Sequence, residues 1–196
     1  MRIINPRELI TLGIFSVIMV AITMVINMLA VFTPLLIPIT KSLSGIVAAI
    51  PFVLYVSRVN QAGPIALMAV IIGLVMVLAG DYILTLASAL IAGVISDLLC
   101  SAARRRGSPL LVVLGYGVFN LWSAGGLLPL IFMRQEIAQQ VAQQLGDQYA
   151  GVFTALFTVP VVCWTLVGIF ISGLAGAGIG VRILHQHFVR AGLVQK

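Results

Sequence analysis

Residues 9–32 read LITLGIFSVIMVAITMVINMLAVF, a run without a single charged side chain. An α-helix rises about 1.5 Å per residue, so about 20 mainly apolar residues cross the hydrocarbon core of a bilayer, which is about 30 Å thick. The run is also longer than the apolar core of a signal peptide, which has about 7–15 residues. It therefore predicts a membrane-spanning first helix that is retained in the mature protein.

The rest of the chain has the same character. Of its 196 residues, 61% are hydrophobic and only 8% are charged, whereas an ordinary soluble domain is about 45–50% apolar and about 25% charged. A water-soluble globule could not bury so much apolar surface, and the length leaves no room for a sizeable soluble catalytic unit beside a helical bundle. We therefore expect one all-α integral membrane domain that covers residues 1–196.

Charges, prolines and glycines divide the chain into six predicted transmembrane helices. These helices cover residues 9–32, 42–57, 64–80, 82–102, 109–133 and 151–180. The polar segment 134–150 carries Ile137, Val141 and Leu145 at intervals of four residues. This spacing predicts an amphipathic helix, either an ordinary connector on the outer interface or a lid over the mouth of the bundle.

The distribution of basic residues predicts the orientation. With the N-terminus inside, six crossings place nine of the eleven Lys and Arg residues in the cytoplasm, as the positive-inside rule requires. The nine are Arg2, Arg7, Arg58, Arg104, Arg105, Arg106, Arg182, Arg190 and Lys196, and only Lys41 and Arg134 fall outside. We expect a multi-pass protein of the bacterial inner membrane with both termini cytoplasmic. The net charge of +6 thus indicates topology and not nucleic-acid binding.

Polar and aromatic side chains within or beside these helices are candidates for a ligand site, because polar groups in hydrocarbon need partners. Asp81 and Tyr82 lie in an outer turn, where they either face a ligand or form simple turn structure. Asn120 lies near the middle of its helix, with Tyr116 one turn before it and Trp122 just after it. The amide of Asn120 either binds a ligand or pairs with another helix.

Three further residues have two interpretations each. Trp164 lies too deep for the interfacial aromatic belt, so it either stacks on a ligand or fills the core. Arg134 suits a carboxylate or phosphate on a ligand, although an arginine at an outer helix end usually extends to the interface. Asp97 lies one turn inside the basic end of its helix, where pairing with the neighbouring arginines is favoured over a role in proton relay.

Sequence patterns of an enzyme are absent. The chain has no phosphate-binding glycine loop followed by lysine, no paired intramembrane acids and no His-Glu-x-x-His motif. Its two histidines, His185 and His187, lie in the predicted cytoplasmic tail, and Cys100 and Cys163 lack metal-like spacing. We therefore expect no catalytic residue, no metal site and no cofactor, so active transport would need a partner that hydrolyses ATP.

Small residues suggest two contact surfaces. Gly176-x-x-x-Gly180 has the spacing that lets membrane helices approach closely. In the first helix, Gly13, Ser16 and Ala21 form a flatter patch that could meet another subunit.

A succession of motifs extends along nearly the whole chain. They are Arg7 to Phe15 (RELITLGIF), Gly93-x-x-x-Asp97-Leu98-Leu99, residues 114–122 (LGYGVFNLW), Gly125-Gly126-x-x-Pro129-Leu130, Gly173-x-x-Gly176-Ala177-x-x-Gly180 and His187-Phe188-x-x-Ala191-Gly192. This pattern resembles the substrate-specific S components of energy-coupling factor (ECF) transporters, specifically the Trep_Strep-type family of small integral membrane proteins. The closing motif is its most specific part.

The resemblance implies a six-helix S-component fold that captures a scarce nutrient from outside. Such subunits dock through their first helix on a T component that carries two ABC ATPases. Family members usually have an Ala-x-x-x-Ala contact motif there, and only Gly13, Ser16 and Ala21 can take its place in this chain. We expect the pocket to open outward and to include Asp81, Tyr82, Tyr116, Asn120, Trp122, Arg134 and Trp164.

The nature of the substrate stays open between a vitamin-like compound and a tetrapyrrole such as haem. Haem could take Tyr82, Tyr149 or Met133 as an axial ligand, but a vitamin held by stacking and amides explains the same region. The lack of outer histidines disfavours nickel and cobalt ions. Two other functions compete: a stand-alone secondary carrier or channel, which predicts inverted repeats that are not evident here, and a membrane scaffold protein, for which the glycine patches would suffice.

Overall fold

The structure, a computed structural model, describes residues 6–58 and 61–190, with side chains up to residue 186. Arg2, Lys196 and the Ala191-Gly192 part of the closing motif lie outside the described residues. Within them every regular element is helical. The elements are α1 (Pro6–Asn27), η1 (Met28–Val31), η2 (Pro34–Leu36), α2 (Ile37–Arg58), α3 (Pro64–Leu78), α4 (Leu84–Arg106), α5 (Pro109–Asn120), η3 (Leu121–Ser123), α6 (Ala124–Leu127), α7 (Pro129–Phe132), α8 (Arg134–Leu145), α9 (Asp147–Leu156) and α10 (Val159–Arg190).

Five helical stretches in the described residues are long and apolar enough to cross a membrane. They are Pro6–Val31, Pro34–Arg58, Leu84–Arg106, Pro109–Phe132 and Val159–Gln186. The remaining apolar helix, α3, has 15 residues, which corresponds to about 22 Å and is shorter than the hydrocarbon core. The structure therefore supports an integral membrane protein with five candidate spans and one shorter apolar helix.

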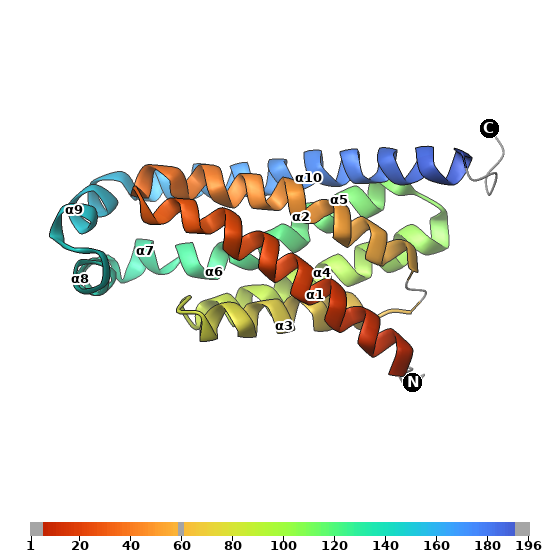
Figure 1. Cartoon of the computed structure of the whole chain (residues 1–196), viewed down its shortest axis with the longest axis horizontal. Helices are drawn as coiled ribbons and strands as arrows, with labels where there is room; N and C mark the ends of the chain where they lie inside the picture. The colour runs from red at the N-terminus through yellow and green to blue at the C-terminus, as the bar shows by residue number, and fades with distance from the viewer. Residues whose placement is uncertain (1–5, 59–60, 191–196) are drawn as a thin grey trace.

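The helices run lengthwise in one bundle, with α1 crossing it obliquely (Figure 1). The first residues of α1, the last residues of α10 and the turn between α4 and α5 lie at one end of this bundle, and α8 and α9 lie at the other. We call the first the basic end, because it carries Arg7, Arg58, Arg104, Arg105, Arg106 and Arg182. The opposite end, with Lys41 and Arg134, is called the distal end.

Several helix boundaries differ from those predicted. Helix α2 begins at Ile37 and not at residue 42, because Pro38 fits the first turn, where no backbone N–H is needed. Helix α4 begins at Leu84, so Tyr82 lies in the preceding turn. The last helix begins at Val159 and not at residue 151, because Gly151 belongs to the separate helix α9.

The predicted helix 109–133 is interrupted near its middle. Helix α5 ends at Asn120, and a 3₁₀ turn and the short helices α6 and α7 follow. Gly125 and Gly126 weaken a helix, and Pro129 removes the N–H that would bond to the carbonyl of Gly125. The interruption places this segment, with its polar residues, beside the distal half of the bundle.

Close helix contacts depend on small residues, as the sequence predicted for Gly176-x-x-x-Gly180. A methyl group at Gly176 would lie 2.7 Å from the Cα of Ile46, and one at Gly180 would lie 3.2 Å from a methyl of Val53. The partner of this motif is therefore α2 of the same chain. Gly93 likewise lets α4 approach α3, where an added methyl would lie 2.5 Å from the Cβ of Ala69.

Asp97 stabilises the start of α3. Its buried carboxylate accepts hydrogen bonds from the backbone N–H groups of Gly63, at 2.7 Å, and Ile65, at 3.1 Å. Arg104 instead donates to the carbonyl of Gln61 and the hydroxyl of Ser101. The predicted pairing of Asp97 with the arginine run is thus replaced by a cap on α3, because the first N–H groups of a helix lack partners within it.

Candidate ligand cavity at the distal end

A cavity of about 540 Å³ lies at the distal end of the bundle. This size is within the range of about 300–1,000 Å³ that is typical of small-molecule sites. Its lining comes from the ends of α1, η1 and α3, the start of α2, the turn before α4, and α6, α7 and α9. The lining residues are Met24, Asn27, Met28, Ala30, Val31, Ile37, Thr40, Lys41, Met76, Ala79, Gly80, Asp81, Gly126, Leu127, Leu130, Phe153 and Phe157.

Local backbone structure sets the position of Asp81. Gly80 has a φ of +109°, a conformation that favours glycine, and the N–H of Asp81 bonds to the carbonyl of Met76 at 2.9 Å. Across the cavity wall, a methyl group at Gly126 would lie only 2.8 Å from a carboxylate oxygen of Asp81. The absence of a side chain at Gly126 therefore lets this carboxylate rest against α6.

Besides the buried Thr40, three polar side chains stand out in the mainly apolar lining. Lys41 and Asp81 carry opposite charges and are both half-buried. Asn27 has a buried side-chain oxygen, Oδ1, without a hydrogen-bond partner. Charged groups at membrane depth are costly unless they are paired or face water, so these residues mark the cavity as a polar site that is open to water or to a ligand.

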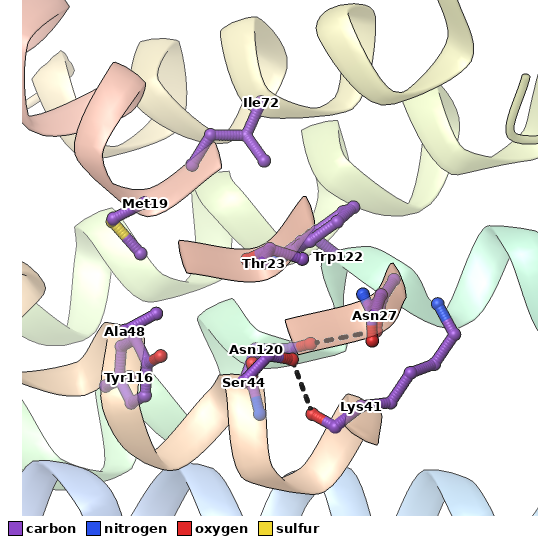
Figure 2. Close-up of a pocket in the computed structure, with 11 residues that line it drawn as sticks. Met19, Thr23, Asn27, Lys41, Ser44, Ala48, Ile72, Tyr116, Asn120 and Trp122 are labelled. Carbon is purple, nitrogen blue, oxygen red and sulfur yellow. Dashed lines mark hydrogen bonds between the residues drawn. The ribbon is translucent and has the colours of Figure 1, made fainter. Parts of the chain in front are cut away.

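A second, much narrower cavity continues from the first toward the middle of the bundle. Its volume is about 10 Å³, about enough for one water molecule. Asn27 and Lys41 line both cavities, and Figure 2 shows the side chain of Lys41 extending from α2 toward Asn27 on α1. The narrow cavity is also lined by Met19, Thr23, Ser44, Ala48, Ile72, Tyr116, Asn120, Trp122 and Ser123.

Three of the predicted site residues, Tyr116, Asn120 and Trp122, therefore lie together around the narrow cavity (Figure 2). Tyr116 donates to the carbonyl of Gly45 at 2.7 Å, and the amide nitrogen of Asn120 donates to the carbonyl of Ile169 at 2.8 Å. Both groups thus connect helices, which is the alternative that the sequence left open for Asn120. They form the floor below the larger cavity.

The other predicted site residues are more dispersed. Asp81 lines the larger cavity. The hydroxyl of Tyr82 donates to the sulfur of Met133 at 2.9 Å, and the guanidinium of Arg134 donates to the carbonyl of Thr154. Neither Tyr82 nor Arg134 belongs to the lining of either cavity.

Trp164 does not contribute to the site in this structure. Its side chain is 73% exposed on the outer side of α10, whereas Thr165 and Ile169 are buried. The sequence prediction failed here because α10 is apolar on several sides, so its pattern does not distinguish the core from the lipid-facing surface. The candidate haem ligands Tyr82, Tyr149 and Met133 are also absent from the cavity lining, whose methionines are Met24, Met28 and Met76.

Helices α8 and α9 lie at the distal end (Figure 1). The predicted amphipathic helix of segment 134–150 is present as α8 and the start of α9. Tyr149 donates to the carbonyl of Ala30 in η1 at 2.8 Å, and Phe153 and Phe157 form part of the cavity wall. Burial raises the pKa of the Tyr149 hydroxyl above its ordinary value. These contacts place α9 across the side of the cavity.

The three residues of the predicted docking patch lie on different faces of α1. Ser16 is only 1% exposed and faces the bundle. It lies on the same face of α1 as the buried residues Leu12, Phe15 and Met19. Gly13 is half-buried with open space beside it, and Ala21 is exposed. Ser16 is thus unavailable to another subunit in this structure.

The fold and its cavity define a multi-pass helical membrane protein with a candidate small-molecule site. The chain belongs to a family described as hypothetical bacterial integral membrane proteins (Trep_Strep), whose model matches residues 6–190. The chain matches no curated protein and no solved structure.

Proposed function

We propose that this chain is the substrate-binding subunit, or S component, of an ECF-type ABC transporter in the bacterial inner membrane. The observation that carries the proposal is the 540 Å³ cavity, which combines an apolar wall with the polar groups of Asn27, Lys41 and Asp81. Concave apolar sites with a few polar anchors are typical of small-molecule binding. A vitamin-like compound or a tetrapyrrole would enter from the outside.

The orientation in this proposal follows from the arginines. Because basic residues favour the cytoplasmic side, the basic end lies inside and the cavity opens outside. Helix α3 provides the additional crossing. Its first turn lies near Arg104, which bonds to Gln61, whereas the turn after it lines the distal cavity. This course supports six passes with both termini cytoplasmic, although α3 alone is shorter than the hydrocarbon core.

The closed floor of the cavity favours capture over passage. Toward the basic end, the fully buried rings of Phe52, Tyr116 and Phe119 pack together, with centroids 4.7 Å apart for Phe52–Tyr116 and Phe52–Phe119. A stand-alone channel or carrier would need an alternative route through this cluster. A subunit that delivers its substrate together with an energy-coupling module does not need a permanent route of its own.

Co-purification from the native bacterium tests the proposed partners. We expect the affinity-tagged chain to recover a T component and two ABC ATPases, because the chain itself lacks a nucleotide-binding motif. Ala21 is exposed on α1, so Ala21→Trp should reduce this recovery about tenfold, equivalent to ~1.4 kcal/mol of binding free energy.

Ala87→Trp, on the exposed face of α4, is the matched control and should recover the module normally. Recovery of the chain with its ligand but without any ATPase would contradict the ECF assignment and favour a stand-alone carrier. Recovery of other membrane proteins without ligand or ATPase would favour a scaffold.

A further inference from the structure

We propose that the distal cavity selects a zwitterionic solute, with a cationic group that pairs with Asp81 and an acidic group that pairs with Lys41. The inference rests on the proposed function, because it assumes that the cavity is the substrate site. It narrows the substrate to a class defined by charge.

The first argument is the state of the two charged side chains. Lys41 and Asp81 are half-buried in a wall made mainly of apolar residues. Among the described residues, neither side chain has an ion-pair partner. Removing a charge from water without a partner is costly, and a solute with both charges would provide each with one.

The structure around Asp81 also fits direct contact with a ligand. Its carboxylate rests against Gly126, where a side chain would collide with it. The neighbouring wall residues Ala79 and Gly80 are small. A carboxylate with so little side-chain cover remains open on its cavity side, where a protonated amine or another cation could approach it.

Asn27 and Lys41 together determine which hydrogen bonds a ligand group near them can form. Its Oδ1 is buried without a partner and can only accept a hydrogen bond. Lys41 lines the same cavities and can only donate. A ligand group at this position must therefore offer an acceptor to Lys41, as an acidic group does, and an adjacent N–H or hydroxyl on that group would pair with the Oδ1 of Asn27.

The remaining wall residues determine which kind of group can join the two charged ends of the ligand. Met24, Met28 and Met76 are adaptable side chains, and Phe153 and Phe157 provide flat apolar surface. Together they suit an apolar body. A tetrapyrrole with two carboxylates and no cation would bring a like charge near Asp81, so the charge pattern disfavours it.

The test uses four probes with the same apolar body: octanoic acid with an amine on its terminal carbon, octylamine, octanoic acid and octanol. Their affinities for the full chain in lipid nanodiscs are measured by calorimetry. We expect the zwitterion to bind the wild type at least about tenfold more tightly than either singly charged probe, which corresponds to ~1.4 kcal/mol for the added charge contact.

Substitution of Asp81 or of Lys41 should each remove one part of the preference for the zwitterion. Asp81→Asn should abolish the advantage of the zwitterion over octanoic acid, and Lys41→Gln should abolish its advantage over octylamine. The matched controls are Glu136→Gln on α8 and Arg106→Gln on α4, which remove one charge of each sign from exposed positions that do not line the cavity. Both controls should retain the wild-type order of affinities.

The outcomes separate the two proposals. Equal binding of all four probes to the wild type would overturn the zwitterion inference and leave the cavity as a binding site. Failure of every probe to bind would overturn both the inference and the placement of the substrate site. The wild-type comparison decides the question even where a variant fails to fold.

Discussion

Gly125→Ala is expected to lower the midpoint of thermal unfolding by about 10 °C, because overpacking against backbone costs ~3 kcal/mol and each kcal/mol shifts a chain of this size by about 2–4 °C. The added methyl would lie 2.2 Å from the carbonyl oxygen of Leu84 and 2.3 Å from the nitrogen of Thr85. Backbone atoms cannot rotate away, so α6 would have to separate from the start of α4.

That separation would break a local hydrogen-bond relay. The N–H of Gly125 donates to the hydroxyl of Ser88 at 3.0 Å, and this hydroxyl donates to the carbonyl of Trp122 at 2.6 Å. The relay holds the interrupted helix beside α4, next to both cavities. Gly125→Ala should therefore also weaken ligand binding.

Gly151→Ala in α9 is the matched control, since no atom lies within 4 Å of the added methyl. Alanine is the better helix former by up to about 1 kcal/mol, so this variant should melt at or slightly above the wild-type temperature. Differential scanning fluorimetry in one detergent compares the three proteins. Equal melting of Gly125→Ala and wild type would show that the contact between α4 and α6 is looser than described.

Asp97→Ala is the second large effect and should destabilise the protein by ~2–4 kcal/mol. The substitution leaves the buried N–H of Ile65 and the partly buried N–H of Gly63 without their acceptor, and a buried unsatisfied donor costs about 1–3 kcal/mol. Hydrogen exchange followed by mass spectrometry should show faster exchange in the first turns of α3.

Two further variants test whether the faster exchange in α3 depends on the carboxylate of Asp97. Asp97→Asn keeps one side-chain oxygen as an acceptor and should fall between alanine and wild type. Asp147→Ala removes an exposed carboxylate from the first turn of α9 and should leave exchange in α3 unchanged. Protection of α3 that is identical in wild type and Asp97→Ala would refute the capping role.

The long apolar runs predicted the α-helical class and most of the spans, because membrane-spanning helices need both length and apolar composition. The amphipathic helix of segment 134–150 was also predictable from its apolar spacing. The interruption after Asn120 was missed, although Gly125, Gly126 and Pro129 were visible signals of it. The length and the mainly apolar composition of residues 109–133 favoured a single helix.

The candidate site was only partly predictable. Asp81, Tyr116, Asn120 and Trp122 line one of the two cavities, but Asn27 and Lys41, which connect them, were not singled out. Asn27 is a polar residue inside the first apolar run, which was an available signal. The direction in which Trp164 and Ser16 point could not be predicted, because helices that are apolar all around do not reveal their buried face.

The central claim is that the distal cavity holds the substrate, and native mass spectrometry of the gently extracted protein tests it most directly. Ala79 lines the cavity at the end of α3, so Ala79→Trp should fill part of it, whereas Ala87→Trp lies outside its lining. We predict a bound small molecule, distinct from bilayer lipids, on wild type and Ala87→Trp and its loss from Ala79→Trp. The same small molecule retained on Ala79→Trp would contradict the account.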